Sequence, residues 1–218
     1  MGIRGPLAPN EIYHVYNRGT EKRKVFITQK DYERFLALLH FCNSTKQTQI
    51  GNMRDMTLAE LLSLDKGEPL VDIAAYCLMP NHFHLLLRQR KEGGISKFMQ
   101  KLVTGYTMYF NVKNDRTGAL FQGKYKSKHA GEDRYLKYLM AYIHLNPHKL
   151  AQDKISRFDL DKELESYRYS SYAEYAGEIR PQSVLVTKDA IPLYFPTPAD
   201  FKKELQEWLS YPAKDSLS

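Results

Sequence analysis

The chain has 218 residues, of which 43% are hydrophobic, and a net charge of +7, values that allow one sizeable core and exclude a disordered polypeptide. Its two cysteines, Cys42 and Cys77, lie far apart without C-x-x-C spacing, which excludes a disulfide framework and a thiolate metal motif. No apolar run reaches the roughly 18 residues of a membrane span and no signal-peptide pattern opens the chain, so we expect a cytoplasmic protein without membrane contact.

The first predicted elements are a strand and a helix. Residues 1–10 are rich in Gly and Pro, and "EIYHVYNRG" (11–19) then alternates its side chains between two faces, which predicts a strand. The stretch "TQKDYERFLALLHFCNS" (28–44) opens with Thr28 as a candidate N-cap and places its large apolar residues along one stripe. That spacing predicts an amphipathic helix.

The middle of the chain predicts a β-hairpin after an insertion. Residues 44–70 are polar with scattered leucines, and within them "TLAELLSLD" (57–65) predicts a short helix. Two apolar, β-prone runs follow, "LVDIAAYCLMP" (70–80) and "HFHLLLRQ" (82–89), joined by a Pro-Asn pair typical of a turn.

Two helices and a strand are predicted next. Helical spacing covers "ISKFMQKLVTGYTMYFNVKN" (95–114), a strand lies near "YKSKHA" (125–130), and Asp133 caps a helix over "RYLKYLMAYIHLN" (134–146). The order β-α-β-β-α-β with an added helix predicts an α+β, ferredoxin-like split βαβ fold with an antiparallel sheet. We predict one domain over residues 1–150, interrupted by the insertion, and a packed C-terminal extension over 151–218.

Positive charge is concentrated in one part of the sequence. Residues 71–150 contain 13 Lys and Arg against 5 Asp and Glu, whereas the rest contains 19 against 20. Such a distribution is typical of a protein that binds a polyanion, most often nucleic acid, although a solvated lysine-rich surface produces it too. The candidate phosphate contacts are Arg18, Lys97, Lys101, Lys124, Lys126 and Lys128.

His82 and His84 interrupt the apolar run of the second hairpin strand. Side chains alternate along a strand, so both imidazoles project from one face and could clamp a metal. Two nitrogens are too few for a closed structural zinc site, which takes four ligands. Two histidines bonded to backbone or water at a strand end would give the same pattern.

The last predicted helix offers a third ligand. Tyr142 and Asn146 are four residues apart and share a face, with Tyr138 and Tyr135 one and two turns earlier. Two imidazoles and one amide oxygen suit Mg²⁺ or Mn²⁺ acting on a phosphate, with a neighbouring tyrosine as nucleophile. An aromatic packing stripe is the alternative interpretation of these tyrosines.

Four motifs in order resemble one protein family. "YHVYNRG", "PNHFHLLL", "GALFQGKYKS" and "YLKYLMAYIHLNP" together resemble the single-tyrosine HUH transposases, in particular the REP-associated tyrosine transposase branch. The resemblance covers roughly residues 10 to 150. It implies a metal-dependent DNA strand transferase that cleaves and rejoins single-stranded or hairpin DNA through a 5′-phosphotyrosine intermediate.

The resemblance also implies roles for particular residues. The family's metal ligands carry over to His82, His84 and Asn146, and its nucleophile carries over to Tyr142. Asn146 stands where plain insertion-sequence relatives more usually have Gln, and the shorter amide reaches less far. Family members include homodimers that exchange the tyrosine helix and proteins that work as monomers, and the sequence is compatible with both.

Two other functions are compatible with the same residues. One is a hairpin-DNA binding protein or regulator that keeps the fold without turnover, and the other is a metallohydrolase that uses water in place of tyrosine. Tyr138, one turn before Tyr142 on the same face, is the rival nucleophile. His144 points about 200° around the helix from Tyr142, so we expect it to have no direct role.

Overall fold

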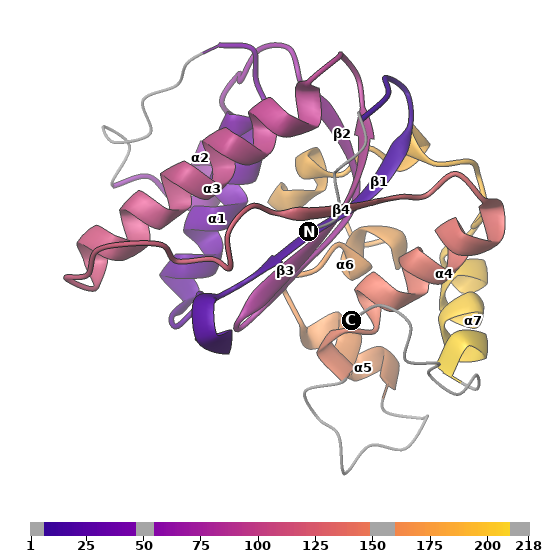
Figure 1. Ribbon diagram of the computed structural model, residues 1–218. Coiled ribbons are helices and arrows are strands. Elements are labelled where there is room, and N and C mark those ends of the chain that lie inside the picture. The colour runs from indigo at the N-terminus through magenta and orange to yellow at the C-terminus, as the bar shows by residue number, and fades with distance from the viewer. Residues whose placement is uncertain (1–6, 47–54, 149–159, 210–218) are drawn as a thin grey trace.

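The computed structural model describes residues 7–46, 55–148 and 160–209, around a four-stranded antiparallel sheet of order β2-β3-β1-β4 (Figure 1). The strands are β1 (Ile12–Arg18), β2 (Val71–Met79), β3 (His82–Gln89) and β4 (Lys126–His129). With a long and a short α-helix between β1 and β2 and one α-helix between β3 and β4, this is the ferredoxin-like order with an added short helix. The predicted α+β fold is confirmed.

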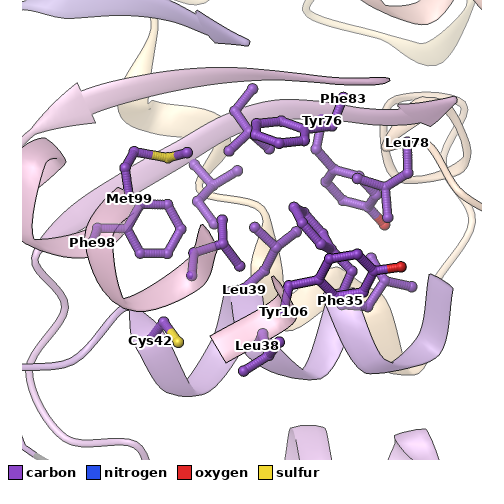
Figure 2. Close-up of a cluster of buried hydrophobic side chains, with 14 of the residues drawn as sticks. Phe35, Leu38, Leu39, Cys42, Tyr76, Leu78, Phe83, Phe98, Met99 and Tyr106 are labelled. Atoms are coloured by element: carbon purple, nitrogen blue, oxygen red, sulfur yellow. The ribbon is translucent and has the colours of Figure 1, made fainter. Parts of the chain in front are cut away.

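One face of the sheet is covered by α1 (Gln29–Cys42), α3 (Gly94–Lys113) and the short α2 (Leu58–Ser63) (Figure 1). The side chains of β3 that point this way are apolar and include Phe83. Figure 2 shows Phe83 above Phe35 of α1 and Tyr106 of α3. The ring centroid of Phe35 is 5.2 Å from that of Phe83 and 5.0 Å from that of Tyr106. Burying each such side chain contributes about 1.5–3 kcal/mol.

The opposite face is covered by α4 (Asp133–His144) and by the C-terminal helices (Figure 1). A second core forms here, in which Cys77 and Leu86 of the sheet pack with Met140 of α4 and Phe201. The two cores face opposite sides of one sheet, as the alternation along β3 requires. The C-terminal helices are α5 (Leu160–Ser166), α6 (Tyr172–Tyr175) and α7 (Pro198–Leu209), and three 3₁₀ turns cover Thr20–Lys22, Pro181–Leu185 and Lys188–Ala190.

The C-terminal segment is bonded directly to the outer strand of the sheet. The Leu78 amide donates to the Tyr169 carbonyl at 2.9 Å, and the Ser171 amide donates to the Tyr76 carbonyl at the same distance. These bonds satisfy edge groups of β2 that would otherwise face solvent. The predicted boundary near residue 150 lies outside the described residues.

Most predicted element bounds agree with the structure to within two residues. The helix predicted over 134–146 begins at Asp133, and Glu132 rather than Asp133 is its N-cap. The predicted insertion contains α2, and residues 47–54 of it lie outside the described part. Cys42 and Cys77 are both buried free thiols. Within the described ranges, no helix is long and apolar enough to cross a membrane.

Candidate active site

Cross-strand pairing brings the predicted histidines and basic residues onto one face of the sheet. His82 pairs with Arg18, and His84 pairs with Tyr16, which on its other side pairs with Lys126. Directly paired residues project from the same face. The two histidine rings lie 4.9 Å apart between centroids, so they share a face as the two-residue spacing predicts.

Tyr142 contacts His84, one of these two histidines. Its ring centroid is 5.3 Å from that of His84, and the two rings meet edge-on at 83°. The tyrosine is half-buried on α4, and the helix reaches the histidines because Met140 and Ile143 pack its other side into the second core. Burial raises the pKa of the Tyr142 phenol, and the neighbouring Tyr138 and Tyr16 add to that rise.

Asn146 lies one turn beyond Tyr142, just after α4 ends. Its amide nitrogen donates to the Tyr142 carbonyl at 2.7 Å, and the side chain is buried. Because the nitrogen is committed to the helix end, the amide oxygen is the atom that remains to bind a ligand. The bond also fixes the amide relative to the tyrosine backbone.

Tyr138 occupies a different environment from Tyr142. Its ring stacks on that of Tyr142 at 5.8 Å and on that of Tyr135 at 6.1 Å, and Trp208 of α7 meets it edge-on at 5.2 Å. Aromatic rings therefore surround Tyr138, whereas the Tyr142 ring contacts a histidine. This geometry favours Tyr142 over Tyr138 as the reacting tyrosine.

His144 points into the second core, away from the other histidines. Its Nδ1 hydrogen bonds the Met140 carbonyl at 2.8 Å and its Nε2 hydrogen bonds the Ser171 hydroxyl at 2.7 Å. Complete burial lowers the pKa of His144 to about 4, so the ring is neutral at pH 7. It attaches α4 to the C-terminal segment.

The chain is similar to known proteins both in sequence and in fold. Residues 9–146 match the model of the family described as "Transposase IS200 like". The chain belongs to the IS200-like transposase family. This match confirms the predicted family resemblance and supports a transposase-like function on DNA.

A solved structure has a similar fold. It is described as a REP-associated tyrosine transposase bound to a REP hairpin, and it superposes with a TM-score of 0.53 at 12% sequence identity. The match covers 84% of this chain and 90% of that chain, so it includes most of both proteins. No curated protein matches the sequence significantly.

The basic residues of this IS200-like transposase divide between the two faces of the sheet. Exposed Lys126 and Lys128 of β4 lie on the histidine face, 5.9 Å from the ring of Tyr16 and 4.8 Å from the ring of Tyr135, respectively. Aromatic rings at this range hold an ammonium group by cation–π attraction. Exposed Lys124 precedes β4 in the chain, and exposed Arg18, the last residue of β1, pairs with His82.

Lys97 and Lys101 are on α3, in the layer on the other side of the sheet from the histidines (Figure 1). The Lys101 ammonium donates to the carbonyl of Ser44 at 2.8 Å and to that of Lys46 at 3.0 Å. It therefore supports the loop that follows α1. The structure does not bring these two predicted DNA contacts together with the other four.

A divalent ion at His82 and His84 would need further ligands from nearby side chains. In the described part of the chain, no three His, Cys, Asp or Glu side chains form a group that could hold a metal. A metal at His82 and His84 therefore needs a ligand of another type, and the Asn146 amide oxygen has the chemistry for it. The residues present fit a Mg²⁺ or Mn²⁺ site with open positions.

His14 of β1 is a site residue to which sequence analysis assigned no role. Its Nε2 lies 2.9 Å from Nδ1 of His84, and its ring is 6.0 Å from that of Tyr142. Burial, with a smaller contribution from nearby Lys128, lowers the pKa of His14 to about 4, so the ring is neutral at pH 7. The alternation of "YHVYNRG" places His14 on one strand face, but only the pairing of β1 with β3 brings it to His84.

Proposed function

We propose that this IS200-like transposase cleaves and rejoins single-stranded or hairpin DNA through a covalent bond between Tyr142 and the 5′-phosphate. The observation that carries the proposal is the position of the Tyr142 ring, 5.3 Å from the ring of His84 on a face lined with basic residues. This position supports the proposal that a nucleophile, a metal site and a surface for a polyanion lie together.

The proposed reaction exchanges one phosphodiester for another. The Tyr142 oxygen forms a bond to the scissile phosphorus and the bond from phosphorus to the 3′-oxygen breaks, while the phenol loses a proton and the departing 3′-oxygen gains one. The new ester keeps the energy of the old one, so rejoining needs no external energy source. An ordinary phenol has a pKa near ~10 and burial raises that of Tyr142, so attack needs assistance.

We assign that assistance to Mg²⁺ or Mn²⁺ held by His82, His84 and Asn146. When bound there, such an ion would withdraw charge from the non-bridging phosphate oxygens and would help to orient the phosphate for in-line attack. The two imidazoles come from one strand, β3, and the amide comes from the turn after Tyr142, to whose carbonyl it is hydrogen bonded. The proposed ligands and nucleophile therefore belong to two elements that are packed together. The open coordination positions are those that the phosphate would take.

The basic residues on the histidine face are the proposed DNA contacts. Arg18 ends β1, Lys126 and Lys128 are on β4, and Lys124 precedes β4 in the chain. We propose that these four residues follow the phosphates of the strand being cut. The structurally similar transposase was solved with a REP hairpin, which supports a hairpin as the DNA form. Lys97 and Lys101 lie on the other layer and are left out of this path.

Covalent trapping tests the proposal. Labelled hairpin DNA with Mn²⁺ should give a protein-linked species on a denaturing gel with the wild-type chain, and none with Tyr142→Phe or His82→Ala. Tyr138→Phe is the matched control and should retain the adduct, because Tyr138 stacks on other rings. An adduct that persists in Tyr142→Phe and disappears in Tyr138→Phe would transfer the nucleophile to Tyr138.

A binding protein without turnover is the second candidate. The half-burial of the Tyr142 ring favours it, because a ring packed between Tyr138 and His84 must expose its hydroxyl to a phosphate before it can react. This candidate predicts tight hairpin binding and no adduct with the wild-type chain, whichever divalent ion is added.

A further inference from the structure

The hydrogen bond between His14 and His84 joins two buried rings from different strands. The two nitrogens lie 2.9 Å apart, the ring planes are inclined by 21°, and the exposed fractions of the residues are 2% and 5%. Seventy positions separate them in the sequence, and the β1–β3 register alone brings them together. The bond therefore depends on the formed sheet.

This bond determines which nitrogen of His84 can hold a metal. Nδ1 of His84 faces His14, so Nε2 is the nitrogen that can turn toward a divalent ion. A neutral imidazole has one N–H and one lone pair. Nε2 offers its lone pair only when the hydrogen is on Nδ1, and this N–H must then donate to Nε2 of His14.

Among the described residues, His14 has no second hydrogen-bond partner that would oppose this arrangement. Its other nitrogen, Nδ1, is buried and makes no hydrogen bond to any of the described residues. Nε2 of His14 can therefore serve as acceptor with the hydrogen on Nδ1. Burial keeps water from replacing either partner, so a lost bond at this position is not repaired by solvent.

On the basis of the proposed metal site, we propose that His14 is a positioning residue. It accepts a hydrogen bond from Nδ1 of His84 and so holds His84 in the tautomer that can bind a metal. Metal-ligating histidines generally donate their other N–H to a nearby acceptor, which fixes tautomer and ring orientation. Here that acceptor is a second histidine, supplied by the neighbouring strand.

Manganese affinity tests the inference without measuring DNA cleavage. Free Mn²⁺ is followed by electron paramagnetic resonance during titration of the full chain. His14→Phe keeps a ring but removes the acceptor, and it should weaken binding about 10–100-fold. His14→Gln should bind nearer to wild type, because its amide oxygen can take the place of Nε2.

His40→Phe is the matched control. His40 is also buried, at 5% exposed, but it hydrogen bonds the Leu64 carbonyl in the other layer. Its replacement should leave Mn²⁺ affinity unchanged even where it lowers thermal stability. Equal Mn²⁺ affinity of wild type and folded His14→Phe would overturn the inference and leave the proposed function standing. A wild-type chain that binds no Mn²⁺ would overturn the proposed metal site and this inference with it.

Histidine tautomers give a second readout on the wild-type chain alone. Long-range proton–nitrogen correlation spectra of the ¹⁵N-histidine-labelled protein distinguish hydrogen on Nδ1 from hydrogen on Nε2. We expect His84 with its hydrogen on Nδ1. Hydrogen on Nε2 of His84 in the Mn²⁺-free protein, kept when diamagnetic Mg²⁺ is added, would overturn the inference even if His14→Phe failed to fold.

Discussion

Asp31 is a completely buried carboxylate at the start of α1. Its shifted pKa makes the stability of the fold depend on pH. Burial alone would raise this pKa, but hydrogen bonds from Lys113, from the Thr28 and Ile27 amides and from Tyr109 outweigh burial and hold it below its ordinary value. A carboxylate with a lower pKa in the folded chain stabilises the fold above its unfolded pKa near ~3.9.

That stabilisation should be lost as the pH falls below about 4, through the folded pKa of Asp31. Asp31→Asn removes the charge while keeping the shape, so we expect it to lower stability at pH 7 by about 1–3 kcal/mol. Urea midpoints measured from pH 7 to pH 3 should converge between wild type and variant at the acid end. A constant difference between the two chains over this range would contradict the assignment.

The site residues divide into those that local spacing predicts and those that it does not. The common face of His82 and His84 follows from the two-residue period of a strand, and the placement of Asn146 beyond Tyr142 follows from the helical period. The contact of His14 with His84 depends on strand register across 70 positions, which no local pattern encodes. The commitment of Lys101 to backbone carbonyls after α1 is equally non-local.

Among the elements, β4 presents lysines on the histidine face, where we propose that DNA binds. Lys126→Ala should weaken hairpin binding and reduce the slope of log affinity against log salt by about 0.7–0.9, the effect of one lost phosphate contact. Lys97→Ala removes the same charge from α3 on the other layer and should leave the slope unchanged. Fluorescence anisotropy at four salt concentrations measures both. Equal slope changes in the two variants would mean that the lysines act through net charge alone.

The C-terminal segment is held by a buried ion pair. Arg180 Nε donates to a Glu174 carboxylate oxygen at 2.6 Å, and the two side chains are 11% and 2% exposed. The same guanidinium donates to the carbonyls of Ser170 and Arg168, next to the segment that bonds β2. These contacts tie α6 and the following turn to the sheet edge.

Removing one member of this pair leaves a buried charge. We expect Arg180→Ala to lower the free energy of unfolding by about 3–5 kcal/mol. Lys202→Ala breaks the Lys202–Glu165 pair, which is more exposed, and should cost about 0–1 kcal/mol. Chemical denaturation of both variants makes the comparison, and a loss below 1 kcal/mol in Arg180→Ala would show that the segment docks without the pair.

The sequence predicts the longer elements of residues 10–146 well because they are strongly periodic. It predicts only a packed extension after residue 150, because α5 and α6 are too short to produce a sustained period. Sequence analysis also assigned no element to α7, although that helix is 12 residues long. Their positions depend on Arg180, Ser171 and the β2 edge, which are tertiary contacts.

At the scale of the molecule, one chain contains every part of the proposed site. Tyr142 of α4 contacts His84 of the same chain, and α4 is anchored in the second core and, through His144, to Ser171. An exchanged tyrosine helix would have to leave both anchors. We therefore predict cleavage in cis.

Mixing two inactive variants tests this prediction. His82→Ala keeps Tyr142 and Tyr142→Phe keeps both histidines, so a dimer that exchanged its tyrosine helices would build one intact site in each mixed pair. With cleavage in cis, the mixture should form no DNA adduct above that of either variant alone. In an equal mixture half of the dimers would be mixed, each with one intact site of two, so adduct recovery of about a quarter of the wild-type level would show that the helix is exchanged. Wild-type chain added to either variant is the control for interference.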